Sequence, residues 1–140
     1  MRLSLQTDYA LRTLLYVATR SGRATVAEVA EFYDISAHHL GKVVHQLGRL
    51  GYIRNRRGPG GGFELARSAS AITAGQVVLD LEGSTHLLDC VATPGVCVIQ
   101  PGCTLRGVFE QAEQRYMDYL RSVTLESLLP DPLNLLTFKA

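Results

Sequence analysis

Three cysteines carry the clearest chemistry in this sequence. Cys90, Cys97 and Cys103 are its only cysteines, and they lie close together within a chain of 140 residues. Pro-Gly pairs at 94–95 and 101–102 interrupt the stretch between them. Because proline fixes φ while glycine permits positive φ, we expect a folded-back loop here. Such a loop can bring three thiolates to one point.

Soft thiolates crowded into one loop favour an iron–sulfur cluster or zinc over harder cations. The cysteines are separated by six and then five residues, without the closely spaced pairs that structural zinc sites use. The sequence therefore favours a cluster; a metal-free thiol switch, a zinc site and buried structural cysteines are the alternatives. Three cysteines leave one coordination position open. The neighbouring candidates are His86, Asp89 and Glu82, of which the imidazole is favoured on chemical grounds.

The elements that would position this loop begin with a helix-turn-helix pattern. Apolar residues at helical spacing predict a first helix over about residues 5–20, ended at Ser21. Thr25 and Glu28 have the spacing of a capping box for a second helix, and Ser36 can cap a third over about residues 37–50. The third helix keeps polar and basic residues on one face, as a recognition helix does, although a generic helical hairpin shares this outline.

A β-hairpin is predicted directly after the third helix, and it favours the winged form of the motif. Residues 52–57 and 63–65 have strand character and flank a tip that consists of glycine and one proline. Three arginines lead into this tip, where they can contact phosphates while the bare backbone approaches DNA closely. A nucleotide phosphate loop is disfavoured, because its lysine-containing motif is absent and no helix follows the glycines.

A long amphipathic helix is predicted after the third cysteine. Its apolar residues recur at three- and four-residue steps, namely Leu105, Val108, Phe109, Ala112, Tyr116, Tyr119, Leu120 and Val123. The opposite face carries Glu110, Glu113, Gln114, Asp118 and Arg121. Such a helix can complete the core or pair with a second copy. We favour pairing, because small DNA-binding proteins commonly bind two-fold sites as dimers.

The fold class that follows is mainly α with a small β-hairpin wing: a winged helix-turn-helix plus a long C-terminal dimerisation helix. We expect a DNA-binding domain over residues 1–67, a connecting helix and cluster-binding loop over 68–103, and a dimerisation helix and tail over 104–140. Thr73 is the expected cap of the connecting helix, and the Pro-Asp-Pro sequence at 130–132 is expected to end the last helical turn.

Charge is divided unevenly along the chain. The net charge is +1, yet residues 1–67 hold 10 Lys and Arg against 5 Asp and Glu, while residues 68–140 hold 4 against 8. A basic N-terminal half suggests a polyanionic partner. The sequence has neither a signal peptide nor an apolar run long enough for a membrane span. It also lacks a catalytic triad and a carboxylate pair placed for acid–base work. We therefore expect a cytoplasmic protein that is not an enzyme.

Four sequence features occur together in a specific combination. They are the opening Met-Arg-Leu-Ser-x-x-Thr-Asp-Tyr-Ala-Leu-Arg, the wing motif at 57–63, the Ser-Ala-Ile connection at 70–72, and three cysteines ahead of a long helix. In these features, which span nearly the whole chain, the sequence resembles the Rrf2 family of bacterial winged-helix regulators. The resemblance implies a homodimer whose long helices cross, a cluster near the dimer interface, and operator binding through the third helix and the wing.

The resemblance also implies metal ligands. These are Cys90, Cys97 and Cys103, with a 4Fe–4S cluster favoured over 2Fe–2S. Some members use a histidine three residues after the third cysteine, but this chain has Arg106 there. Nitric-oxide-sensing members use an aspartate near the start of the first helix of the other subunit, which matches Asp8. Asp8 is therefore the expected fourth ligand, although an acid there also offsets the positive end of its helix.

The DNA contacts implied by matching position lie in the third helix and the wing. They are Ser36, His38, His39, Lys42, Arg54, Arg56, Arg57 and the backbone around Gly60. The predicted function is a repressor that binds double-stranded operator DNA and whose iron–sulfur cluster senses nitric oxide, so that cluster damage releases the operator. An iron-status or redox-responsive iron–sulfur regulator of the same fold is the alternative.

Overall fold

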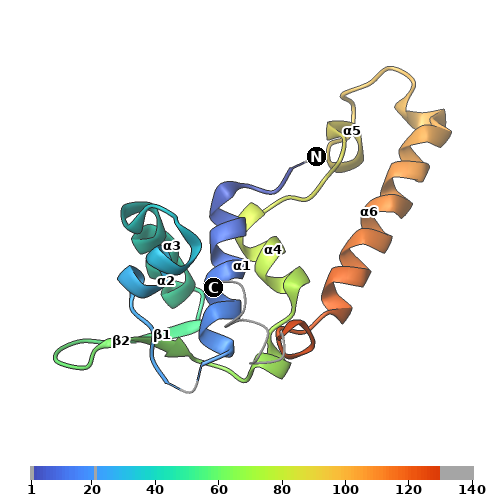
Figure 1. Cartoon of the computed structure of the whole chain (residues 1–140). Helices are drawn as coiled ribbons and strands as arrows, with labels where there is room; N and C mark the ends of the chain where they lie inside the picture. The colour runs from blue at the N-terminus through green and yellow to red at the C-terminus, as the bar shows by residue number, and fades with distance from the viewer. Residues whose placement is uncertain (1, 21, 130–140) are drawn as a thin grey trace.

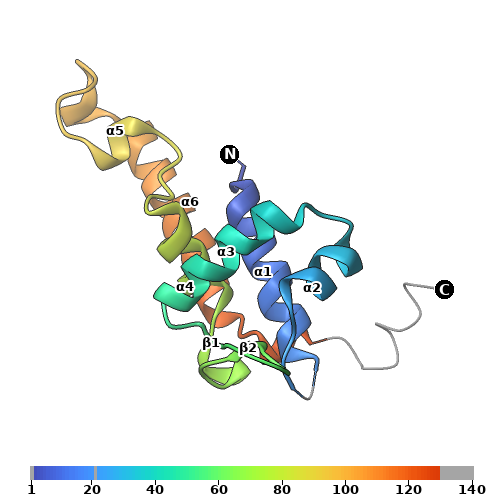
Figure 2. The ribbon, with the colours of Figure 1, turned by 90° about the vertical axis from the view of Figure 1, so that its left-hand side faces the viewer.

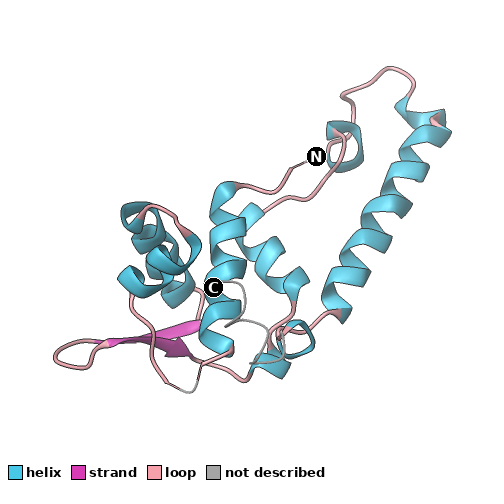
Figure 3. Cartoon of the chain, in the orientation of Figure 1, coloured by secondary structure: helices cyan, strands magenta, loops and turns pink. Residues whose placement is uncertain are grey.

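Helices dominate the structure, a computed structural model that describes residues 2–20 and 22–129 (Figures 1 and 3). The predicted helix end at Ser21 and the predicted stop at 130–132 lie outside the described residues. The elements, with η marking short 3-10 helices, are α1 (Leu5–Ala18), α2 (Val26–Tyr33), α3 (Ala37–Arg49), β1 (Ile53–Arg56), β2 (Gly62–Leu65), η1 (Ala69–Ala71), α4 (Ala74–Glu82), α5 (Asp89–Ala92), η2 (Gln100–Gly102), α6 (Thr104–Ser122) and η3 (Glu126–Leu128).

Local capping signals start the helices where the sequence predicts them. Thr25 accepts a hydrogen bond from the Glu28 N–H, and the Glu28 carboxylate accepts one from the Thr25 N–H at 2.7 Å. The N–H and then the hydroxyl of Thr25, which both donate to this carboxylate, lower the pKa of Glu28. Ser36 caps α3, and Thr73 caps α4 through a second capping box. These parts of the prediction are confirmed, although α1 ends slightly early, at Ala18.

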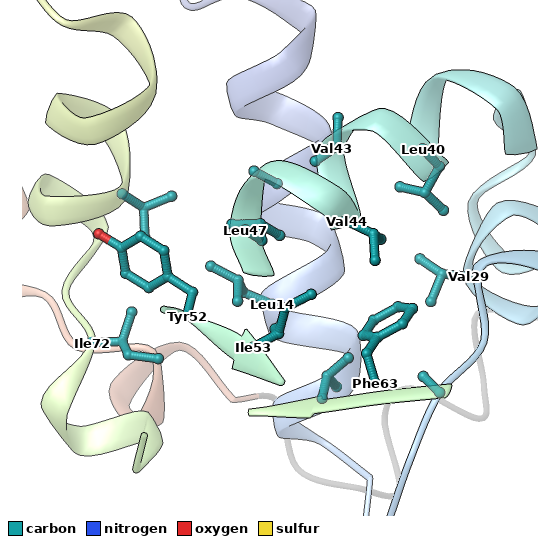
Figure 4. Packing of buried hydrophobic residues seen from close by; sticks show 14 of the residues in the cluster. Leu14, Val29, Leu40, Val43, Val44, Leu47, Tyr52, Ile53, Phe63 and Ile72 are labelled. Atoms are coloured by element: carbon teal, nitrogen blue, oxygen red, sulfur yellow. The ribbon is translucent and has the colours of Figure 1, made fainter. Parts of the chain in front are cut away.

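The core lies where α1, α3, the hairpin and α4 converge (Figure 4). Here α3 buries Leu40, Val43, Val44 and Leu47. Tyr52 and Ile72 extend the core toward α4, and the Tyr52 hydroxyl points at that helix (Figure 4). This hydroxyl donates a hydrogen bond to Asp80 Oδ2 at 2.5 Å. Burial, followed by this bond, raises the pKa of Tyr52. The helices α3 and α4 are thus joined through one core.

The antiparallel strands β1 and β2 form the predicted wing, with Arg56 opposite Gly62. The segment before α2 joins the hairpin, since Ala24 and Phe63 exchange backbone hydrogen bonds of 2.9 and 2.8 Å. Gly62 has a φ of 139°, and a Cβ there would lie 2.5 Å from the Ala24 carbonyl oxygen. This close approach requires glycine. The base of the wing is therefore held firmly against the helical body.

The helix α6 and the cysteine-containing segment form an arm beside the winged domain (Figures 1 and 2). The arm packs on α4, and Gly75 permits the approach, because a Cβ there would lie 2.7 Å from the Arg121 backbone nitrogen. A hydrogen bond of 2.9 Å from the Ala74 N–H to the Val123 carbonyl ties the C-terminal end of the arm to the start of α4. The helix α5 and the loop that joins it to α6 lie at the other end of the arm (Figure 1), and this stretch carries the cysteines.

Only part of the apolar side of α6 packs within the chain, namely half-buried Phe109, Tyr116 and Leu120. Leu105, Val108 and Tyr119 are 57%, 61% and 70% exposed. Glu113 and Met117 are the residues that α6 buries. The exposed residues form an apolar face that the described part of the chain leaves uncovered, whereas an amphipathic helix on a core usually buries its whole apolar side. No helix in the described ranges is long and apolar enough to cross a membrane.

Candidate metal centre and nucleic-acid interface

The three cysteines sit in one excursion of the chain between α4 and α6. Cys90 lies in α5, and Cys103 immediately precedes the first residue of α6. All three thiols are free, Cys97 being exposed and the other two half-buried. The predicted loop is therefore present, but the one-turn helix α5 and the 3-10 helix η2 give it more regular structure than the Pro-Gly pairs suggest.

Gln100 holds this excursion in its folded-back shape. Its side-chain nitrogen donates hydrogen bonds to the carbonyl oxygens of Cys90 at 2.6 Å and Thr93 at 2.9 Å. Its side-chain oxygen accepts one from the Gly95 N–H at 2.5 Å. The side chain is buried and 8% of Gln100 is exposed, so these bonds are shielded from water. Sequence reasoning missed Gln100, because a single glutamine between two cysteines produces no recognisable pattern.

The donor set suits soft metal chemistry, since free thiols are the ligands of iron–sulfur clusters. Within residues 2–20 and 22–129, no three His, Cys, Asp or Glu side chains form a group that could hold a metal ion. The described chain therefore supplies thiols of the right type but does not gather them at one point. A complete site requires rearrangement of the loop, and a non-cysteine ligand would have to approach it.

Asp8 lies on the first turn of α1 at the surface. Its side chain is 41% exposed and accepts a hydrogen bond from Arg12 Nε at 2.9 Å. Together with Arg2, Leu3 and Leu11 it lines a hollow near the N-terminus. An acid in this turn also offsets the positive helix end. The carboxylate is thus accessible to a second molecule, and Arg12 is the group with which a metal would compete.

Two other candidate ligands are engaged within the chain. Glu82 accepts hydrogen bonds from the Ser4 N–H at 2.7 Å and the Thr7 hydroxyl at 2.5 Å. These bonds, that of Thr7 first, lower the pKa of Glu82. His86 Nδ1 lies 2.9 Å from Glu113 Oε2. Both side chains therefore have structural roles that the sequence alone does not reveal. Asp89, the third candidate, occupies the first turn of α5.

The outer face of α3 displays the predicted contact residues. Ser36 caps the helix, and His38, His39 and Lys42 are exposed on its first two turns. The opposite face is buried in the core, so these side chains are fixed to a rigid element rather than to a loop. Side chains near the N-terminal end of a helix are the ones that reach base edges when such a helix enters a major groove.

The wing presents arginine on an exposed strand and a glycine tip. Arg56 and Arg57 are exposed, and Gly60 has a φ of 69°, in the region that favours glycine. Arg54 forms an ion pair of 2.7 Å with Glu64 on the facing strand, although its side chain is 70% exposed. Contact between Arg54 and a phosphate would therefore compete with this carboxylate.

Arg23 positions the wing and was missed by sequence reasoning. Its Nη1 donates a hydrogen bond to the Gly60 carbonyl oxygen at 2.8 Å. Its Nε lies 4.0 Å from Glu64 Oε2. An isolated arginine before a helix gives no sign that it will reach back to the hairpin tip. Its long side chain nevertheless ties the tip to the segment that precedes α2.

Comparison with known proteins identifies this architecture. Residues 3–131 match the Rrf2 family profile, described as an iron-dependent transcriptional regulator. The chain belongs to the Rrf2 family. This confirms the family predicted from the wing motif and the cysteines, and it makes the protein a transcriptional regulator whose relatives are regulators rather than enzymes.

Two similar Rrf2 relatives bear the name HTH-type transcriptional regulator NsrR. That of Oceanobacillus iheyensis is 40% identical over 139 residues, covering 97% of this chain and 95% of its own. That of Bacillus subtilis is 39% identical over 132 residues, covering 92% and 90%. The predicted similarity to NsrR within the family is confirmed.

Solved structures of Rrf2 proteins share the fold. CymR, the global cysteine regulator of B. subtilis, has a TM-score of 0.78 at 25% identity and covers 91% of this chain and 95% of its own. IscR of T. potens has a TM-score of 0.74 at 22% identity, covering 91% and 85%. With these winged-helix neighbours, the predicted fold class, mainly α with a β-hairpin wing, is confirmed.

Proposed function

We propose that this protein is a DNA-binding transcriptional repressor whose iron–sulfur cluster senses nitric oxide. The observation that carries the proposal is the occurrence of three free cysteines in one loop, with an accessible Asp8 on α1, in a chain 40% identical to a protein named NsrR. The protein acts as a homodimer on double-stranded operator DNA in the bacterial cytoplasm.

The winged domain supports operator binding. Ser36, His38, His39 and Lys42 provide the contacts from α3, and Arg54, Arg56, Arg57 and the Gly60 backbone provide those from the wing. Contacts from α3 to base edges specify the sequence, whereas wing arginines bind phosphates or enter the minor groove and fix the register. The net charge is +5 for residues 1–67 and −4 for the remainder. The positive charge that would attract DNA thus lies in the half of the chain that contains these residues.

The exposed face of α6 supports the homodimer. A long helix that leaves Leu105, Val108 and Tyr119 exposed has an apolar face that the described part of the chain does not cover. A second copy of α6 has the same face, and an isologous pair would bury both. Two winged domains held in this way would match the two halves of a pseudo-palindromic operator.

The residues that would hold the cluster are Cys90, Cys97 and Cys103, and the partner's Asp8 would complete the set. A 4Fe–4S cluster is favoured over 2Fe–2S. When bound, the cluster would supply iron that reacts with nitric oxide. In this scheme Asp8 has two partners, the metal and Arg12. An Asp8 carboxylate free of metal would pair with Arg12 on its own helix, as it does here, and would then no longer link α1 to the other subunit or hold the recognition helices at the operator spacing.

Anaerobic purification followed by nitric oxide titration tests this function. Visible absorbance and binding to operator DNA would be followed together in wild-type protein, in Asp8→Ala, and in Glu31→Ala, which removes an exposed acid of α2 as a control. We expect a visible band that bleaches as wild-type DNA binding is lost, with an altered response only in Asp8→Ala. A colourless protein that binds DNA tightly would contradict the cluster, and an unchanged Asp8→Ala would contradict its role as ligand.

A second candidate is a regulator that responds to iron status or redox state, with cluster occupancy as the signal. The description of the matching family as iron-dependent favours it. Nitric oxide exposure and iron chelation would be compared at equal cluster content. A cluster that withstands nitric oxide but is lost to the chelator, together with DNA binding, would establish this alternative in place of nitric oxide sensing.

A further inference from the structure

Residues 82–87, which we call the connecting segment, join three functional parts of the molecule. The segment begins at the end of α4 and leads directly into the cysteine-containing loop through α5. One end is bonded to the first turn of α1, and the other is bonded to the middle of α6. The Gly83 φ of 70° turns the chain sharply out of α4. The segment is thus fixed at two points that are distant in sequence.

The bond to α1 is made by Glu82. Its Oε1 accepts hydrogen bonds from the Ser4 N–H at 2.7 Å and the Thr7 hydroxyl at 2.5 Å. Ser4 is itself the N-cap of α1 and bonds the Thr7 N–H. Thr7 is fully buried and adjoins Asp8. The carboxylate at the end of α4 therefore holds the helical turn that carries the proposed fourth ligand.

The bond to α6 is made by Glu113. Its Oε1 accepts a hydrogen bond from the Leu87 N–H at 2.6 Å, and its Oε2 lies 2.9 Å from His86 Nδ1. Only 9% of Glu113 is exposed, and it is the one charged residue that is buried among the residues described. A buried carboxylate is strongly destabilising without such partners. It therefore fixes the segment three residues before Cys90.

From these contacts we propose that Glu113 and Glu82 are positioning residues that couple the cysteine loop to α1 of the same protomer through the connecting segment. This inference rests on the proposed function for its biological meaning, although the coupling itself is a property of the chain. A displacement of Cys90 pulls on Leu87 and His86, which Glu113 restrains. Because Glu113 holds these residues in place, the displacement is passed along the segment to Glu82 and hence to the first turn of α1, whose packing on α3 carries it to the recognition helix.

Hydrogen–deuterium exchange of the metal-free protein tests the coupling without any cluster. Glu113→Leu removes the acceptor while conserving most of the volume, and Glu113→Gln keeps an acceptor for the Leu87 N–H. Glu110→Leu, one turn earlier and half-exposed in an ion pair with Arg106, is the matched control. A lost hydrogen bond corresponds to roughly fivefold faster local exchange.

We expect Glu113→Leu to accelerate exchange by about fivefold or more in residues 84–91 and also in residues 4–8, which Glu113 does not contact. Glu113→Gln should restore most of the protection, and Glu110→Leu should leave both segments unchanged. The coupling should also act in the opposite direction, from α1 to the loop. Glu82→Leu should therefore accelerate exchange at Leu87 as well as at Ser4. Faster exchange confined to residues 84–91 in Glu113→Leu would overturn the coupling, as would equal acceleration in the control.

Alkylation rates of the free thiols provide a second readout in the same variants. Glu113→Leu should raise the rate at Cys90 severalfold while the rate at the already exposed Cys97 stays constant. Equal rates at Cys90 in Glu113→Leu and wild type would contradict the positioning role. Neither measurement uses nitric oxide or DNA. If the protein proves not to sense nitric oxide, the exchange and alkylation results still decide whether the coupling exists. Where the cluster is loaded, the ratio of operator affinities between loaded and metal-free protein should fall toward one in Glu113→Leu and Glu82→Leu but not in the control.

Discussion

The uncovered face of α6 gives the most direct prediction, which concerns Val108→Asp. Val108 lies in the middle of the exposed apolar face and is 61% exposed. If a second copy covers this face, the substitution places two carboxylates in an apolar interface, one from each protomer. Because the side chain makes few contacts within its own chain, the folding of the protomer should change little.

The size of the effect follows from the exposed fraction. Full burial of a valine side chain stabilises by roughly 1.5–3 kcal/mol. With 61% of Val108 left to bury, each copy would contribute about 1 kcal/mol and the pair about 2 kcal/mol. Burying carboxylates without partners adds at least about 1 kcal/mol. The total of about 3 kcal/mol corresponds to dimer dissociation that is roughly a hundredfold or more easier.

Sedimentation equilibrium over a range of concentrations measures this change, with Gln114→Glu as the control. Gln114 is exposed on the polar side of α6, so the control adds the same charge outside the predicted interface. We expect dissociation of Val108→Asp, unchanged association of Gln114→Glu, and loss of tight binding to two-fold operator DNA only in the first. If both variants associate as wild type does, the apolar face of α6 is not the dimer interface.

Three further changes test the fold and the wing. Tyr52→Phe, which removes the hydroxyl bonded to Asp80, should cost about 1–2 kcal/mol in urea unfolding at neutral pH. Burial raises the pKa of Tyr52 above its ordinary value of 10.0, so the wild-type protein keeps the stabilisation from the protonated hydroxyl below pH 10 and loses it as the pH rises further. Tyr52→Phe should lose less stability over this range, and urea unfolding above pH 10 measures the difference. Gly75→Ala should destabilise by about 1–3 kcal/mol, because its Cβ would meet the Arg121 backbone and push α6 away from α4, and thermal unfolding measures this. Arg56→Ala should reduce the salt dependence of operator binding by about one phosphate contact per protomer without changing which operator is preferred, measured by titration at several salt concentrations.

The parts of the fold that the sequence predicted well are those determined by neighbouring residues. Capping boxes such as Thr25 with Glu28 involve a hydroxyl and a carboxylate three residues apart, so their spacing is visible in the sequence. The wing is similar, because its glycine tip allows backbone conformations that other residues avoid, as the φ of Gly62 shows. These signals were enough to identify a winged helix-turn-helix.

The parts that sequence reasoning missed depend on contacts between distant residues. Gln100 organises the cysteine loop through carbonyl groups that carry no side-chain signature. Arg23 reaches the wing tip across 37 positions of sequence. Glu113 belongs by its spacing to the polar face of α6, yet it is buried while Glu110 and Gln114 on that face are exposed. Periodicity identifies two faces of a helix, but it does not show which face is covered by the same chain and which by a second copy.

Packing order determines how the cysteine loop can influence DNA binding. Within one chain, α6 packs on α4, α4 packs on α1, and α1 packs on α3. An effect of the loop on the recognition helix therefore passes either through this series or across a dimer interface to the partner. Because Glu82 and Asp8 act on the same turn of α1, both routes would end at that turn. A regulator built this way responds to the loop through the position of α1, while the core beneath α3 stays intact. For this reason, variants at Glu82 and Asp8 should alter the response to the signal more than the stability of the winged domain.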